Sequence, residues 1–129
     1  MIKVLIPLNP EFKQYEKELK ILYEQNQDAI CDTNSFEFIR DNTLFYMFIN
    51  DTSLIGAIYY FMDNDRLFLN GFSYRKRHNL TVQCLSISLT WFVSDIYAEA
   101  QNRASALCLL KCGFKRVKDK LFVYKSSLE

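Results

Sequence analysis

The chain has 129 residues, half of them hydrophobic, and a formal net charge of +1. This length fits one domain over residues 1–129 with enough apolar material for its own core, which excludes a largely disordered chain. The apolar runs are short and interrupted and the N-terminus shows no secretory pattern, so we expect a cytoplasmic protein that does not span a membrane.

The charges are divided unevenly between the two halves of the chain. Residues 1–65 contain five Lys or Arg and eleven Asp or Glu, whereas residues 66–129 contain eleven and four. Such a division can mark the binding site of an anionic partner, or the two halves can attract each other within one fold. Because the net charge is small and the basic run 75–77 is short, we do not expect nucleic acid as a partner.

The sequence contains four cysteines and one histidine. Without a secretory signal, the cysteines are expected to be reduced thiols. Cys108 and Cys112 lie one helical turn apart, but the chain has no C-x-x-C pair and only His78 as an imidazole ligand. We therefore expect no zinc site and no other bound metal.

The first half of the sequence predicts a strand, two helices and a strand meander. Residues 2–8 are mostly apolar and predict a strand, and apolar residues at three- and four-residue steps over 12–23 predict a helix. Asp32, Thr33 or Asn34 is expected to cap a short second helix. Strand-like runs separated by hairpin-sized polar gaps follow at 43–49, 53–61 and 66–72.

The second half predicts helices that alternate with strands. Residues 80–93 contain a strictly alternating segment, as in a strand, but their length without a breaker and one apolar helical face favour a helix. The remaining elements are a strand at 95–100, a helix at 103–112 ending at Gly113, and strands at 114–117 and 120–125. The order β-α-α-β-β-β-α-β-α-β-β predicts an α/β (α+β) domain with a central mixed, mostly antiparallel sheet flanked by helices.

The stretch NRASALCLLKCGF, residues 102–114, is the most specific local pattern in the chain. With the element order, it resembles the GNAT family of N-acetyltransferases, which use acyl-coenzyme A. The family often has an asparagine after its fifth strand, a small residue three positions later and then Lys-x-Gly-Phe, here Asn102, Ser105, Lys111, Gly113 and Phe114. The resemblance implies that Asn102 either caps the helix or holds the pantetheine arm of the coenzyme.

The pyrophosphate loop of the family is degenerate in this chain. In the family, R/Q-x-x-G-x-G/A between the fourth strand and the third helix presents backbone N–H groups to the pyrophosphate. The corresponding stretch FSYRKRHNLTVQ has no glycine: aligned on Trp91, Asn79 and Thr81 take the glycine positions, and aligned on Arg75, His78 and Leu80 take them. We expect cationic side chains to hold the phosphates instead, the alternative being a solvated basic loop.

The resemblance also implies a set of site residues. The residues expected to bind the coenzyme are Phe72, Arg75, Lys76, Arg77, His78, Asn79, Leu80, Thr81, Asn102 and Ser105. Many family members carry a tyrosine seven residues after the asparagine as a general acid, but Leu109 stands there and cannot donate a proton. Glu99 and Tyr60 are expected as catalytic groups, with Glu37 and Tyr59 as alternatives.

The implied function is acyl transfer to an amine. Acetyl-CoA or another acyl-CoA would be the co-substrate, and the amine of a small molecule or protein would attack the thioester directly in a ternary complex. A homodimer is left open as a possible assembly. The alternative is a catalytically inactive protein of this fold that binds another protein or itself, through exposed aromatic residues of the middle strands.

Overall fold

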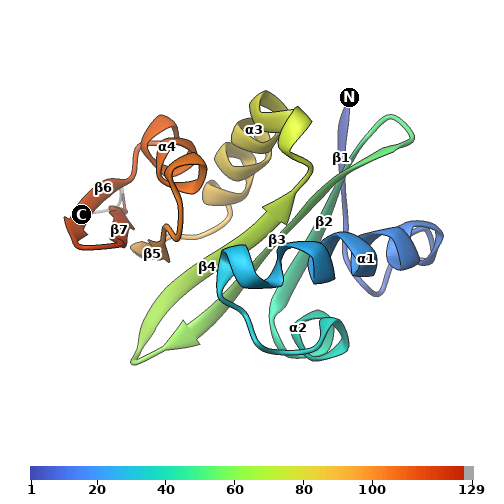
Figure 1. Ribbon diagram of the computed structural model, residues 1–129, viewed down its shortest axis with the longest axis horizontal. Helices are drawn as coiled ribbons and strands as arrows, with labels where there is room; N and C mark the ends of the chain where they lie inside the picture. The colour runs from blue at the N-terminus through green and yellow to red at the C-terminus, as the bar shows by residue number, and fades with distance from the viewer. Residues whose placement is uncertain (127–129) are drawn as a thin grey trace.

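The computed structural model describes residues 1–126, and its elements follow the order predicted from the sequence (Figure 1). They are β1 (Ile2–Leu5), α1 (Phe12–Ile30), α2 (Phe36–Asn42), β2 (Leu44–Asn50), β3 (Ser53–Asp63), β4 (Arg66–Ser73), the 3-10 turn η1 (Arg75–Arg77), α3 (His78–Leu89), β5 (Ile96–Glu99), α4 (Arg103–Lys111), β6 (Lys115–Lys118) and β7 (Leu121–Tyr124). No helix in the described range is both long and apolar enough to cross a membrane.

The strands form one sheet in the order β1-β2-β3-β4-β5-β7-β6. Among the described residues, β4 and β5 make the one parallel pair, and the other neighbouring strands run antiparallel. The predicted fold class, a mixed and mostly antiparallel sheet flanked by helices, is therefore confirmed.

Helices cover both faces of the sheet, with α1 and α2 together on one face and α3 and α4 on the other (Figure 1). Leu19 of α1 shares a core with Tyr59, whereas Leu85 of α3 and Leu109 of α4 share a second core with Tyr60. Successive side chains on a strand point to opposite faces. The neighbours Tyr59 and Tyr60 on β3 therefore belong to different cores, which decides what each can reach.

Helix α3 begins and ends earlier than predicted. It spans His78–Leu89, whereas the sequence favoured 80–93. Thr90 Oγ1 and the Trp91 N–H bond back to carbonyls of the last turn, at 2.7 and 3.1 Å, and close the helix there. The Trp91 ring packs on Tyr46 and Phe48 instead, with ring centroids 4.6 and 6.2 Å away, so aromatic packing on β2 overrides the helical periodicity.

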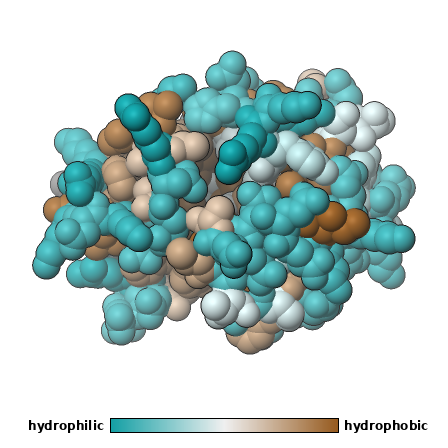
Figure 2. All heavy atoms as spheres, in the orientation of Figure 1, coloured by the Kyte–Doolittle hydropathy of each residue, from teal (hydrophilic) through white to brown (hydrophobic). Residues whose placement is uncertain are grey.

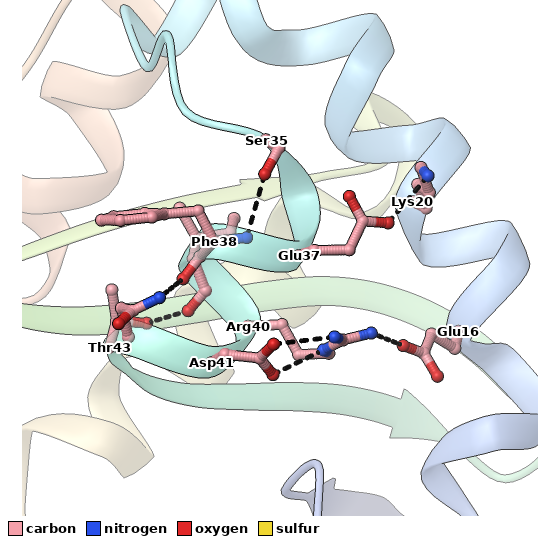
Figure 3. Close-up of polar contacts among 10 residues, drawn as sticks. Glu16, Lys20, Ser35, Glu37, Phe38, Arg40, Asp41 and Thr43 are labelled. Atoms are coloured by element: carbon pink, nitrogen blue, oxygen red, sulfur yellow. Dashed lines mark hydrogen bonds and ion pairs between the residues drawn. The ribbon is translucent and has the colours of Figure 1, made fainter.

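The cap of α2 is also a correction to the sequence prediction. Ser35 occupies the N-cap, and its Oγ accepts a hydrogen bond from the Phe38 N–H at 3.1 Å (Figure 3). The predicted caps Asp32, Thr33 and Asn34 lie in the preceding loop. The Asp32 carboxylate is engaged there, because Asn34 donates to it from both its backbone N and its Nδ2 at 2.9 Å.

Ion pairs fix α2 against α1 (Figure 3). Arg40 Nη1 lies 2.6 Å from Glu16 Oε2, and Lys20 Nζ lies 2.7 Å from Glu37 Oε2. Arg40 also donates to both carboxylate oxygens of Asp41 at 2.8 Å. The hydrogen bond from Lys20 lowers the pKa of Glu37. These contacts hold the loop between the two helices in place over the sheet.

The end of α4 confirms the predicted role of Gly113, which has a φ of 96°. Its N–H donates to the Leu110 carbonyl, and the Phe114 N–H donates to the Leu109 carbonyl, both at 3.1 Å. This pattern is a Schellman motif, in which a left-handed glycine follows the helix and an apolar contact closes it. Leu109 and Phe114 supply that contact in the core.

The surface carries few hydrophobic side chains in the view of Figure 2, where hydrophilic residues dominate and the hydrophobic ones form separate small patches. The sequence analysis offered the aromatic residues of the middle strands as an exposed contact surface. Several of these rings are buried in the two cores instead: Phe45, Phe48, Tyr59, Tyr60 and Phe72. These rings are therefore not available as the contact surface expected for the protein-binding alternative.

The parallel pair β4–β5 parts after a short stretch. Its register runs from Leu67 opposite Ile96 to Leu69 opposite Ala98. Beyond that point β4 stays with β3, where Ser73 pairs with Gly56 and the Tyr74 N–H donates to the Ile55 carbonyl at 3.2 Å. A split therefore opens between β4 and β5.

Candidate functional site

An open groove of about 980 Å³ lies where β4 passes into η1 and α3. We call it the basic groove, and its lining is Glu18, Thr52, Ser53, Leu54, Tyr74, Arg75, Lys76, Arg77, His78, Asn79 and Leu80. The structure thus brings the predicted coenzyme residues 75–80 together along one surface. The cationic side chains come from consecutive positions of a short 3-10 turn and the first turn of α3, which spreads them along the groove.

The N-terminus of α3 adds to the positive character of the basic groove. Within the described chain no side chain caps α3, and its first turn contains no acidic residue. Unpaired N–H groups and the helix dipole at such an end favour an anion, and neighbouring cations at the same end are unfavourable until an anion binds. Arg75, Lys76 and Arg77 stand at this end, so a phosphate there would relieve their repulsion.

Thr81, predicted as a coenzyme residue, serves the loop itself. Its Oγ1 donates to Ser73 Oγ at 2.9 Å and lies 3.0 Å from the Arg77 carbonyl oxygen. The side chain is turned toward the end of β4 and lies outside the lining of the groove. Thr81 occupies a position where the family has a glycine. Its side chain does not enter the groove and instead links the end of β4 to the start of α3.

Two cross-element contacts border the basic groove. Tyr74 donates its hydroxyl to Glu18 Oε2 of α1 at 2.7 Å, and this bond raises the pKa of Tyr74 to about 12. On the other side, Lys111 Nζ of α4 lies 3.2 Å from His78 Nε2. The sequence analysis treated Lys111 only as part of a pattern. The fold brings its charge to a residue that lines the groove.

A second hollow, of about 230 Å³, opens at the split between β4 and β5. We call it the acidic hollow, and it is lined by Ile30, Cys31, Asp32, Thr33, Asn34, Phe61, Phe68, Asn70, Glu99 and Gln101. Asn70 and Glu99 directly follow Leu69 and Ala98, the last pair of the parallel ladder. The hollow therefore begins where the strands separate, on the face covered by α1 and α2.

Glu99 is one of the two predicted catalytic groups. It ends β5, its side chain is exposed, and it lines the acidic hollow. On the opposite strand, the Gly71 N–H donates to Asn70 Oδ1 at 2.9 Å. The hollow thus contains a carboxylate that can accept a proton and Asn70, whose side-chain oxygen accepts from the adjacent Gly71 N–H.

Tyr60 lies away from this split. Its side chain is fully buried in the α3–α4 core, and its hydroxyl lies 2.7 Å from Ser88 Oγ. Burial raises the pKa of Tyr60 and disfavours ionisation. This placement follows from its position on β3, because the side chains of residues 59 and 61 point toward α1 whereas that of residue 60 points away. The catalytic role of Tyr60 stays a prediction, and the structure places its hydroxyl beside Ser88.

Three further predicted coenzyme residues, Phe72, Asn102 and Ser105, take part in core packing or in the cap of α4. The Phe72 ring is buried beside Tyr23 and Tyr59, with ring centroids 5.3 and 6.5 Å away. Asn102 caps α4, since its Oδ1 accepts from the Ser105 N–H at 2.9 Å. All three lie outside the described linings of the groove and the hollow. The capping reading of Asn102 is therefore the one that the structure displays.

Sequence reasoning missed the network beneath the acidic hollow. Tyr59 donates its hydroxyl to Asp32 Oδ2 at 2.6 Å, and Tyr23 donates to the Asn34 carbonyl at 2.7 Å. Both tyrosines are buried, so they tie the α1–α2 loop to the core. The sequence offers only a weak indication of this network. A buried tyrosine hydroxyl needs a hydrogen-bond partner, and Tyr23 and Tyr59 find theirs in the loop between α1 and α2.

Thiols cluster where α4 packs against α3. Cys112 Sγ lies 3.5 Å from the Val82 carbonyl oxygen and 3.4 Å from Ser86 Oγ. A hydrogen bond from Cys108 lowers the pKa of Cys112, whereas burial raises the pKa of Cys84 to about 12. These thiols are free, and the described chain contains no group of three or more His, Cys, Asp or Glu side chains that could hold a metal ion.

Cys112 is expected to react with iodoacetamide about tenfold or more faster than Cys84 near pH 7, because the thiolate is the nucleophile. Mass spectrometry of peptides after timed labelling measures both rates in one sample. Cys31, which is exposed and lies on another element, serves as the internal reference for an accessible thiol. Equal rates for Cys112 and Cys84, or a Cys112 rate that rises only above pH 8, would contradict this prediction.

Comparison with known proteins supports the fold strongly at low sequence identity. No family model and no curated protein matches the sequence. An N-acetyltransferase from Staphylococcus aureus Mu50 is 10% identical over 97% of each chain, with a TM-score of 0.69. The aminoglycoside acetyltransferase AAC(6')-Ib in complex with coenzyme A is 11% identical over 97% of this chain and 95% of its own, with a TM-score of 0.66. The Bacillus subtilis N-acetyltransferase YlbP, also in complex with coenzyme A, is 19% identical over 97% of each, with a TM-score of 0.55. The chain therefore has the GNAT fold.

Proposed function

We propose that the protein is an acyl-CoA-dependent N-acetyltransferase that acts on an amine by direct attack in a ternary complex. The observation that carries this proposal is the pairing of two sites of opposite charge around β4. The basic groove lies at the end of β4, and the acidic hollow lies at the split between β4 and β5. Solved structures with the same fold hold coenzyme A, which supports an acyl-CoA as the co-substrate.

The basic groove would hold the phosphates of the coenzyme through side chains. Arg75, Lys76 and Arg77 can each donate charge-assisted hydrogen bonds to phosphate oxygens, and the first turn of α3 adds backbone N–H groups. Because exposed cations supply much of the attraction, we expect the affinity for acetyl-CoA to fall as the salt concentration rises.

The split would hold the reacting groups. The amine nitrogen attacks the thioester carbonyl carbon, the new C–N bond forms, and the C–S bond breaks to release the coenzyme thiolate. The Gly71 N–H would donate to the carbonyl oxygen in place of its bond to Asn70 Oδ1, and Glu99 would accept the proton that the amine loses. Leu109 is buried and cannot protonate the thiolate, which would take its proton from solvent.

The double variant Arg75→Ala with Arg77→Ala is expected to weaken acetyl-CoA binding about tenfold, because it removes exposed charge-assisted hydrogen bonds. A thermal-shift titration of the wild type and the variant with acetyl-CoA measures this, since a ligand stabilises the state that it binds. The double variant Lys115→Ala with Lys118→Ala, on the exposed edge strand β6, is the matched control.

Equal loss of affinity in both double variants would contradict the assignment of the groove. The absence of any shift with acetyl-CoA, together with a concentration-dependent dimer in sedimentation, would favour the catalytically inactive alternative instead.

A further inference from the structure

The acidic hollow has a lining that suits a small cation with an aliphatic body. Among the described residues that line it, the charged ones are Asp32 and Glu99, both carboxylates. They come from different elements, since Asp32 lies in the α1–α2 loop and Glu99 ends β5. Asn34, Asn70 and Gln101 add amide groups to the lining. A site of this composition favours positive charge and repels carboxylates.

Asp32 is a fixed hydrogen-bond acceptor. Its Oδ2 accepts from the buried Tyr59 hydroxyl at 2.6 Å, and its Oδ1 accepts from Asn34 N and Nδ2 at 2.9 Å each. Each carboxylate oxygen has more than one lone pair, so a further donor can approach from the hollow. Because donors from β3 and from its own loop already orient the carboxylate, little ordering remains when a ligand ammonium binds.

Two aromatic rings form part of the same lining. Phe61 of β3 and Phe68 of β4 stack with their ring centroids 6.0 Å apart and an interplanar angle of 15°. Both are half-buried and both line the hollow. Such rings bury methylene groups and also attract a cation that lies near their faces. A volume of about 230 Å³ leaves room for a short aliphatic chain.

We propose that the acceptor is a short aliphatic diamine, whose reacting amine lies at Glu99 in the split and whose second ammonium binds Asp32 across the Phe61–Phe68 wall. This inference rests on the proposed function, since it names the acceptor class of the same site. The second ammonium is the specificity element: it donates to Asp32, while the chain between the nitrogens covers the rings.

The test compares 1,4-diaminobutane, butylamine and 4-aminobutanoate as acceptors at a fixed, saturating acetyl-CoA concentration. We expect kcat/KM for the diamine to exceed that for butylamine roughly 10- to 100-fold, as a charge-assisted hydrogen bond implies, and 4-aminobutanoate to be the poorest acceptor. Asp32→Asn keeps an oxygen for the Tyr59 hydroxyl but removes the charge. In this variant the ratio of diamine to butylamine should fall toward one, chiefly through the KM for the diamine.

Asp28→Asn, an exposed change on the last turn of α1, is the control variant and should keep the wild-type ratio. Calorimetric titration of 1,4-diaminobutane into the free protein gives a second readout that needs no turnover, and Asp32→Asn should abolish that binding. Acetylation of butylamine as efficiently as the diamine would overturn the acceptor assignment while leaving the acetyltransferase function intact. Diamine binding that depends on Asp32 without acetylation of any amine would support the diamine site and contradict the enzyme. If the diamine neither binds nor is acetylated, that result overturns the acceptor assignment.

Discussion

Replacing Gly56 by alanine is expected to lower the free energy of unfolding by about 3 kcal/mol, which corresponds to a fall in Tm of roughly 10 °C. A Cβ at this position would lie 2.1 Å from the Phe72 carbonyl oxygen and 2.7 Å from Ser73 Cα. These neighbours are backbone atoms of β4, so a side-chain rotation cannot relieve the clash. Urea unfolding followed by circular dichroism measures the change.

The matched control is Gly71→Ala, on the facing strand of the same ladder. There the nearest atom to an added Cβ is the Ala57 carbonyl oxygen at 3.0 Å, a contact that a small shift relieves. We expect a loss of about 1 kcal/mol in this variant. If Gly56→Ala proved no more destabilising than Gly71→Ala, then β4 would not be held against β3 as closely as described.

The Gly56 contact also matters for the site. The close approach at Gly56 lets the end of β4 follow β3 while β5 ends at Glu99, and this divergence creates the split. A side chain at position 56 would push Phe72 and Ser73 away from β3. We therefore expect acetyl-CoA binding to suffer in Gly56→Ala even at a temperature where the variant remains folded.

Glu99→Gln is expected to lower kcat/KM for amine acetylation about 100-fold or more, because it removes the proton acceptor proposed at the split but keeps the shape of the side chain. The loss should appear in kcat rather than in acetyl-CoA affinity, since Glu99 lies in the acidic hollow and not in the basic groove. Steady-state kinetics with the best amine acceptor, combined with a binding titration of acetyl-CoA, separates the two effects.

Glu37→Gln is the control for this prediction, since the sequence analysis offered both carboxylates. Glu37 accepts a hydrogen bond from Lys20, which lowers the pKa of Glu37. A carboxylate with a lowered pKa is a poorer base. We expect the Glu37→Gln variant to have a kcat close to that of the wild type. Full activity in Glu99→Gln, or an equal loss in Glu37→Gln, would contradict the role given to Glu99.

Much of the fold could be predicted from the sequence because its local signals agree with its tertiary contacts. The apolar spacing in α1 predicted a helix, and Phe12, Leu19, Leu22 and Tyr23 are indeed buried. Gly113 predicted the end of α4 because few other residues adopt a left-handed backbone. Polar gaps of hairpin length predicted the β2–β3–β4 meander, and its antiparallel pairing is confirmed.

The site could be predicted only in part, because it depends on contacts between distant segments. The basic run 75–77 was visible as a charge pattern, and the groove follows from it. The pairing of Asp32 with Tyr59 joins positions 27 residues apart, and the contact between His78 and Lys111 joins positions 33 apart. Periodicity within one element carries no information on either.

The sequence also could not predict which face of the sheet Tyr59 and Tyr60 would point to. Both residues lie in a strand that is buried on its two faces, so the sequence gives no alternation of polar and apolar positions to orient it. Only the helices packed on each face assign Tyr59 to the α1 side, next to the acidic hollow, and Tyr60 to the α3 side. A one-residue difference along β3 thus separates a neighbour of the site from a core residue.

The central claim is that side chains of the basic groove hold the coenzyme and direct its acyl end to the split. A titration of ¹⁵N-labelled protein with acetyl-CoA, followed by two-dimensional NMR, tests it most directly. We predict saturable shifts in the backbone amides of 74–81 and of Gly71, with the amides of α2 unmoved. Saturable shifts that avoid 74–81 and Gly71, or no shifts at millimolar acetyl-CoA, would contradict the claim.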